Sequence, residues 1–184
     1  MQIIDTFIPD VKIIVPRVFN DERGAFSETY KKPLFDDAGF SIDFVQDNRS
    51  HSVKKFTIRG LHYQAVPHAQ AKLVSVQAGR IFDVAVDLRR GSPTFLRHVG
   101  VELSAAAGDQ IFIPSGFAHG FCTLEPDSIV TYKVDSVYAP DHEMGLHWRT
   151  ADLAIEWPCG PDEALLSPKD LVLPDRVDPA RCFP

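Results

Sequence analysis

The sequence lacks any apolar run of the roughly 18 residues that a membrane-spanning helix needs. Its first ten residues, MQIIDTFIPD, also lack the basic stretch followed by an apolar stretch that is typical of a secretory signal peptide. We therefore expect a protein that has no membrane segment and stays in the cytoplasm.

Basic residues are also fewer than acidic ones. The chain has 19 Lys and Arg against 25 Asp and Glu, a formal net charge of −6. A general nucleic-acid-binding protein normally presents a basic face, so this class is disfavoured. An acidic protein can still bind a small anion where a few Arg and Lys side chains gather.

Cysteine is scarce. Cys122, Cys159 and Cys182 are odd in number and form no CxxC pair. This usage is typical of structural thiols in a reducing compartment.

The sequence shows no internal repeat, no low-complexity linker and no break in composition. Of its 184 residues, 45% are hydrophobic, which is enough to form the buried core of a single domain. We expect that domain to span residues 1–184. Fourteen prolines and eleven glycines are spread along the chain and disfavour long helices.

Short strand signals recur instead, rich in Val, Ile and Phe and separated by Gly, Pro or Asp. They cover residues 11–19, 56–64, 71–79, 80–88, 97–104, 109–116, 119–124 and 128–136. The run VQAGRIFDV predicts a hairpin that turns near Gly79. Short helices are expected near residues 31–38 and 162–166. The pattern predicts an all-β fold, a sandwich or barrel of the jelly-roll type with a few short helices.

Strand alternation places Lys72, His119 and Tyr132 on the more apolar face of three different strands. The residues that share their parity are Val74 and Val76, Phe117 and Phe121, and Val130, Val134 and Tyr138. A lysine is rarely buried without a partner, so these side chains, together with His62, predict a polar-lined cavity. Alternation does not relate His62 to Arg59, because Gly60 between them is a candidate β-bulge.

These residue types suit proton transfer next to a carbonyl without a cofactor. A histidine can remove the proton, because its pKa is near neutrality. A lysine or a second histidine can stabilise the enolate oxygen, and a tyrosine can return a proton on the opposite face.

Several longer motifs occur in a specific order. They are DERGAFSETY at residues 21–30, QDNRSHS at 46–52, RGLHYQ at 59–64, AQAKLVSVQAGRIFDVAVDLRRGSPTF at 69–95, IPSGFAHGF at 113–121 and TYKVDSVYAP at 131–140. Over about residues 13–174, the chain resembles the dTDP-4-dehydrorhamnose 3,5-epimerase family. The resemblance implies a cupin-type jelly-roll barrel, a homodimer, and no metal or organic cofactor. It also implies epimerisation at C3 and C5 of a nucleotide-linked 4-keto-6-deoxy sugar, a step toward dTDP-L-rhamnose and lipopolysaccharide.

The resemblance also implies roles for individual residues. His62 corresponds to the general base, Asp170 in LLSPKD to its acidic partner, and Tyr132 to the general acid. Lys72 and His119 correspond to positions that hold the sugar and the enolate oxygen. The diphosphate-binding and other substrate-contact positions are Arg23, Phe26, Glu28, Gln46, Asn48, Arg59, Tyr138 and Glu143. The family's N-terminal segment serves the neighbouring subunit, so Arg23 is expected to act there.

The run GLHWRT at residues 145–150 departs from the family pattern. It leaves open a mono-epimerase that acts on a related 4-keto sugar nucleotide.

Two readings from other classes stay open as well. A metal-dependent cupin oxygenase needs several converging histidines, often in an HxH pair, and the seven histidines here include none. A non-catalytic sugar-binding jelly roll would need no acid–base residues. Hydrolysis is disfavoured, because there is no G-x-S-x-G motif and Cys122 lies on the parity opposite to His119.

Overall fold

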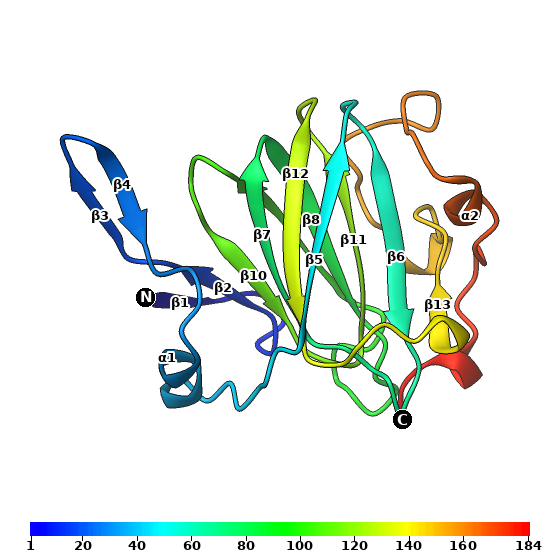
Figure 1. Cartoon of the computed structure of the whole chain (residues 1–184). Coiled ribbons are helices and arrows are strands. Elements are labelled where there is room, and N and C mark those ends of the chain that lie inside the picture. Colours follow the sequence, from blue (N-terminus) through cyan, green and yellow to red (C-terminus); the bar gives the residue numbers. More distant parts are fainter.

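Two antiparallel β-sheets pack against each other in the computed structural model, which describes all 184 residues (Figure 1). One sheet has the order β1-β2-β10-β7-β12-β5 and the other the order β13-β6-β11-β8-β9. The strands of the first sheet are β1 Gln2–Asp5, β2 Lys12–Val15, β10 Gln110–Ile113, β7 Lys72–Ala78, β12 Ser128–Val134 and β5 Gln46–Ser52. Those of the second are β13 Glu143–Gly145, β6 Ile58–Gln64, β11 Phe117–Thr123, β8 Arg80–Asp87 and β9 His98–Ser104. The predicted all-β jelly roll of the cupin type is confirmed.

The core lies between the two sheets. Its largest cluster joins buried residues of the first sheet, such as Val74 and Val130, to residues of the second, such as Ala85 and Phe121. Burial of these apolar side chains is the main contribution to the stability of the fold.

Each of the eight predicted segments contains a strand. The first is divided by Pro16, which cannot donate a ladder hydrogen bond, so β2 ends and β3 (Val18–Asp21) begins after it. Strand β5 was not predicted, because its inward side chains are polar and carry no apolar signal. Gln46, Asn48 and Ser50 line a cavity rather than the core.

The predicted hairpin at Gly79 is wrong. β7 belongs to the six-stranded sheet and β8 to the five-stranded sheet, so the turn carries the chain from one sheet to the other. Gly79 has φ +74°, and a Cβ atom there would collide with Ser128. A glycine turn between two apolar strands has the same local sequence whether the strands pair or cross between sheets.

The first predicted helix is present as α1, Lys32–Asp37, which has a proline in its first turn. The prediction at residues 162–166 is wrong, because Leu165 instead pairs its backbone with Phe56 and Ile58. Helix α2 begins later, at Pro168–Leu171, and Ser167 caps it by accepting from the N–H of Asp170. Three 3-10 turns, η1 Pro140–His142, η2 Ala151–Leu153 and η3 Pro179–Arg181, complete the elements.

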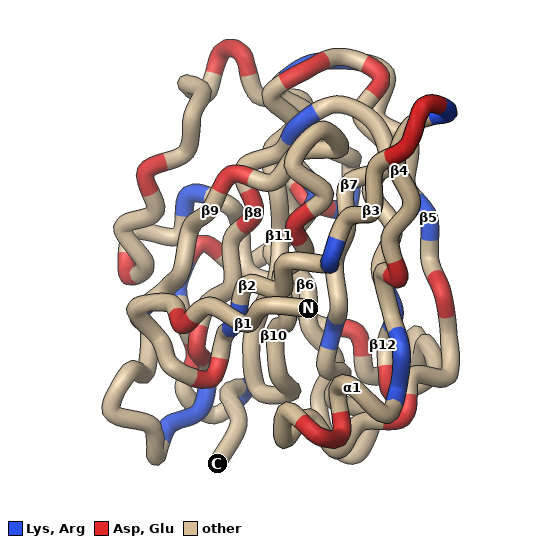
Figure 2. Tube along the Cα trace, turned by 90° about the vertical axis from the view of Figure 1, so that its left-hand side faces the viewer, with Lys and Arg blue, Asp and Glu red and all other residues tan.

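The hairpin of β3 and β4 (Gly24–Ser27) extends away from the two sheets (Figure 1). Phe19 and Phe26 lie on it and are 46% and 66% exposed. Acidic and basic residues are interspersed along the chain as it is seen in Figure 2. No helix reaches the length and hydropathy that crossing a membrane would require.

Candidate active site

A cavity of about 480 Å³ opens between the two sheets. Strands β5, β6, β7, β11 and β12 supply most of its wall, and the segments around Tyr138 and Leu165 supply its rim. The inward orientation predicted for Lys72, His119 and Tyr132 is confirmed, since all three line this cavity. The predicted residues that line it are Gln46, Asn48, Arg59, His62, Lys72, His119, Tyr132, Tyr138, Glu143 and Asp170.

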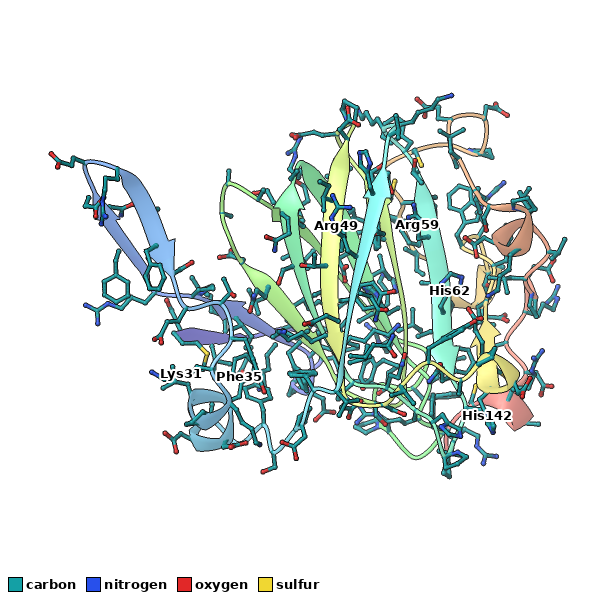
Figure 3. All side chains as sticks on the ribbon, viewed as in Figure 1. Lys31, Phe35, Arg49, Arg59, His62 and His142 are labelled. Carbon is teal, nitrogen blue, oxygen red and sulfur yellow. The ribbon has the colours of Figure 1, made fainter.

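A β-bulge at Gly60 brings Arg59 and His62 into the same cavity. In the register of β6 and β11, His62 lies opposite His119 while Arg59 lies opposite Phe121, with an irregularity between them. In a regular strand two residues three positions apart point to opposite faces, and the extra residue corrects this. Both side chains lie along β6 (Figure 3) and line the cavity.

Only glycine fits at position 60. Its φ is +121°, and a Cβ atom there would lie 2.6 Å from the Cα of Gly120 and 2.8 Å from the carbonyl oxygen of His119. The close approach of β6 and β11 therefore depends on Gly60.

His62 and Asp170 form a hydrogen-bonded pair. The Nε2 atom of His62 lies 2.7 Å from Oδ1 of Asp170, whose side chain is buried. Burial raises the pKa of Asp170, but hydrogen bonds from His62, Ser167 and the backbone N–H of Gly60 outweigh it, and the pKa is lowered. The ionised carboxylate accepts a hydrogen bond from the Nε2–H of His62, and in this neutral tautomer Nδ1 carries a free lone pair.

His119 and Asp83 form a second pair, 2.9 Å apart and buried on both sides. Burial lowers the pKa of His119 and outweighs the opposing effect of Asp83, so the imidazole is neutral near neutral pH. The sequence analysis missed Asp83. The available signal was a carboxylate within the apolar run of strand β8.

Lys72 extends into the cavity from the start of β7. Its Nζ lies 3.4 Å from the carbonyl oxygen of His62. Burial lowers the pKa of Lys72 to about 8, against the opposing charges of Asp83 and Glu143. An ammonium this close to losing its proton is also a strong hydrogen-bond donor toward a developing oxyanion.

Tyr132 lies on β12, in the sheet opposite to the one that carries His62. Burial raises the pKa of Tyr132 above its usual value of 10. The phenol is therefore protonated at neutral pH.

Charged and aromatic side chains line the rim of the cavity. Arg59 donates to Ser52 Oγ and to the carbonyl oxygen of His51, both on β5. Tyr138 donates its hydroxyl to Glu143 at 2.6 Å, and Lys169 forms an ion pair with the same carboxylate at 2.5 Å. Lys169 was missed by the sequence analysis, although it immediately precedes Asp170.

Three predicted substrate-contact residues do not reach this cavity. Arg23 and Phe26 lie on the extended β3–β4 hairpin, and Glu28 follows it. All three are outside the cavity wall, and Arg23 pairs with Asp21 of its own hairpin. Within one chain, the structure leaves the cavity without these groups.

The structure contains no group of three or more His, Cys, Asp and Glu side chains arranged to hold a metal ion. His62 and His119 lie opposite each other on the neighbouring strands β6 and β11, but each directs its Nε2 to a different carboxylate, Asp170 and Asp83 respectively.

The site is therefore a cavity inside a jelly roll, lined by histidine, lysine, tyrosine and carboxylate side chains. A sequence model of the family described as dTDP-4-dehydrorhamnose 3,5-epimerase matches residues 5–177. The chain belongs to this family of isomerases, and the resemblance in its motifs is confirmed.

Individual relatives agree with this assignment. A dTDP-4-dehydrorhamnose 3,5-epimerase of Shigella flexneri is 49% identical over 172 residues, which are 93% of each chain. The solved structure of the Bacillus anthracis dTDP-4-dehydrorhamnose 3,5-epimerase, with TDP and PPi bound, has a TM-score of 0.91 and 49% identity, and the match covers 94% of this chain and 98% of that one.

A second solved structure is that of the dTDP-6-deoxy-D-glucose-3,5-epimerase of Legionella pneumophila in complex with dTDP-4-keto-L-rhamnose. Its TM-score is 0.92 at 44% identity, and the match covers 99% of this chain and 97% of that one.

Proposed function

We propose that the chain converts dTDP-4-dehydro-6-deoxy-D-glucose to dTDP-4-dehydro-L-rhamnose by inverting C3 and C5. The reaction would proceed through enolates and use no metal or organic cofactor. The observation that carries this proposal is the arrangement around one cavity, where the His62–Asp170 pair lies on one sheet and Tyr132 on the other.

His62 is the general base in this proposal. The free lone pair on Nδ1 removes the proton from the carbon next to the 4-keto group, and the electrons of the C–H bond move toward the keto oxygen. Asp170 then faces an imidazolium and stabilises its positive charge. Tyr132 donates a proton to the opposite face of the same carbon, which inverts it, and the C–O double bond re-forms. The His62 imidazolium then loses its proton to solvent and the Tyr132 phenolate takes one up, so that the second carbon can react.

Lys72 stabilises the enolate oxygen, and His119 holds the sugar. Lys72 supplies positive charge within a buried wall, where an electrostatic interaction is stronger than in water. His119 donates its Nε2–H to Asp83, so Asp83 is a positioning residue that holds this imidazole in one tautomer. In that tautomer Nδ1 accepts a hydrogen bond from a sugar hydroxyl.

The nucleotide part lies toward the rim. Arg59 neutralises the diphosphate, while Gln46, Asn48, Tyr138 and Glu143 contact the substrate. A homodimer supplies the missing side chains, because the β3–β4 hairpin of a second copy would bring its Arg23, Phe26 and Glu28 to this cavity. The protein would work in the cytoplasm, on a soluble sugar nucleotide.

The test is proton NMR of the purified protein with dTDP-4-dehydro-6-deoxy-D-glucose in D₂O. Deuterium at both C3 and C5, with formation of the L-rhamno product, is expected. Deuterium and inversion at one carbon only would establish the mono-epimerase alternative. No turnover before or after addition of divalent metal ions would refute epimerisation of this substrate.

A further inference from the structure

The loop of residues 135–139 joins β12 to η1 and carries Tyr138 to the rim of the cavity. It has few backbone partners, and side chains hold it instead. Asp135 at its start accepts from the N–H of Ala71 at 2.7 Å, and three glutamine side chains hold the rest. The bonds are Gln70 Nε2 to Ser136 O at 2.7 Å, Gln64 Nε2 to Val137 O at 3.3 Å, Tyr138 N to Gln46 Oε1 at 2.9 Å and Ala139 N to Gln64 Oε1 at 2.8 Å.

Gln64 makes two of these four bonds and a third elsewhere. It is 3% exposed and lies on β6, two residues after His62. Its Nε2 also donates to the carbonyl oxygen of His68 at 2.7 Å. Both N–H groups and the carbonyl oxygen of its amide are therefore occupied by backbone groups of the protein.

The bonding of Gln64 separates it from the substrate-contact residues. With no N–H left to donate, it has little to offer a ligand although it borders the cavity. A buried backbone group without a partner is costly, so removing the amide would release the loop at both Val137 and Ala139.

The acid–base groups do not depend on this loop. His62 is held by Asp170 on α2, and Lys72 and Tyr132 lie in the strand ladder of β7 and β12. Tyr138 does depend on the loop, and it is 53% exposed at the rim. An exposed aromatic ring can stack on a flat heterocycle.

We propose that Gln64 is a positioning residue that acts through Tyr138 and sets the affinity for the nucleotide part of the substrate. This inference rests on the proposed function, since it takes dTDP as the part that is bound at the rim. The chemical step depends on other residues and is expected to tolerate the loss of Gln64.

The first experiment compares Gln64→Met with Gln77→Met. Methionine keeps the length of the side chain and removes the amide, and Gln77 is an exposed glutamine of β7 outside the cavity wall. For Gln64→Met we expect the Kd of dTDP by calorimetry and the KM of the sugar nucleotide to rise about tenfold, with kcat within about threefold. Gln77→Met should match the wild type.

The second experiment is a double-mutant cycle, which a merely structural role would not satisfy. In a Tyr138→Ala background, Gln64→Met should no longer change the Kd of dTDP, because the residue through which it acts is gone. In an Arg59→Lys background the tenfold effect should persist. An equal effect of Gln64→Met in both backgrounds would overturn the proposal.

Other outcomes also decide the matter. A lower kcat with unchanged KM would place Gln64 in the chemical step, and a lower Tm with wild-type dTDP binding would make it only structural; either overturns the proposal. If the wild type epimerises the sugar while Gln64→Met binds dTDP normally, this inference fails and the proposed function stands. If the wild type does not epimerise it but dTDP binding responds as expected, the proposed function fails and the positioning role stands.

Discussion

The imidazole of His62 and the carboxylate of Asp170 lie 2.7 Å apart although 108 positions separate them in the chain. Strand β6 presents the imidazole and helix α2 the carboxylate, and α2 itself is held by the Ser167 cap. The pair determines which nitrogen of His62 carries the proton, so it links the packing of the C-terminal segment directly to the chemistry of the cavity.

Replacement of the base should stop the reaction at both carbons. For His62→Asn, we expect the solvent deuterium uptake at C3 and C5 to disappear and turnover to fall by at least ~10²–10⁴, the range typical of a general base. Proton NMR in D₂O measures both. His147→Asn, a histidine outside the cavity wall, is the control. Exchange that persists at both carbons in His62→Asn would assign the base to another residue.

Loss of the charge on Asp170 should slow turnover without weakening binding. An asparagine can present its NH₂ group to Nε2 of His62, which moves the proton to Nδ1 and blocks the base. We expect kcat of Asp170→Asn to fall on the order of 10²–10⁴-fold while the Kd of dTDP stays within about threefold. The exposed Asp175→Asn should behave as the wild type. A wild-type rate for Asp170→Asn would remove the pair from the mechanism.

Tyr132→Phe should separate exchange from inversion. The variant keeps the ring and its packing against the core and deletes only the proton donor. His62 can still form the enolate and return a proton to the original face, so deuterium exchange should remain measurable while inversion falls by a larger factor. Equal losses would instead indicate that Tyr132 stabilises the enolate or holds the substrate. Unchanged exchange and inversion would identify a core tyrosine.

Lys72 should limit activity at alkaline pH. Its pKa is lowered to about 8, so the ammonium that stabilises the enolate is lost as pH rises through about 8. The pKa of Tyr132 is raised above 10, so the phenol does not titrate in this range. We expect kcat of the wild type to decline with an apparent pKa of about 8, and the residual activity of Lys72→Met to lack this decline. The same alkaline decline in Lys72→Met would assign it to another group.

The same residue should change the pH dependence of stability. Between a pKa of about 8 in the folded protein and 10.5 in the unfolded chain, the unfolded chain binds more protons. The contribution of Lys72 to the free energy of unfolding therefore rises with pH across this window, by about 3 kcal/mol at most. Urea denaturation of wild type and Lys72→Met at pH 7.5 and 10 should show the gain only in the wild type. An equal gain in both proteins would contradict the buried ammonium.

Mixed subunits should test whether the hairpin acts in the partner's cavity. Arg23→Ala and His62→Asn subunits are each expected to be inactive alone. In a heterodimer of the two, one cavity regains both groups, so mixing should recover activity, measured after subunit exchange has been demonstrated. Exchange without recovery would place Arg23 outside the partner's cavity.

Much of the cavity could be predicted from the sequence, because strand alternation is a local property. Lys72, His119 and Tyr132 each share parity with apolar neighbours, so their inward orientation follows from the two-residue period of a strand alone. The sequence motifs also identified the family, because each of them is a continuous stretch that can be recognised without the fold.

Other features needed the tertiary structure, because they depend on contacts between distant segments. The bulge at Gly60 reflects the approach of Gly120, and this approach decides that Arg59 and His62 share a cavity. Strand β5 carries no apolar signal of its own, since the side chains that it turns inward face a cavity. At Gly79 the local sequence fits a hairpin and a crossing between sheets equally well.

By itself, then, the sequence determined most of the core strands, the inward orientation of Lys72, His119 and Tyr132, and the family, all of which are encoded in short stretches of chain. The family resemblance implied the pair of His62 and Asp170, and the structure brings the two side chains together. Only the tertiary structure decided that His119 pairs with Asp83 and that Gln64 holds the loop of Tyr138. The physical reason is that a buried polar group must find a hydrogen-bond partner, and the packing of the two sheets decides which distant group is within reach.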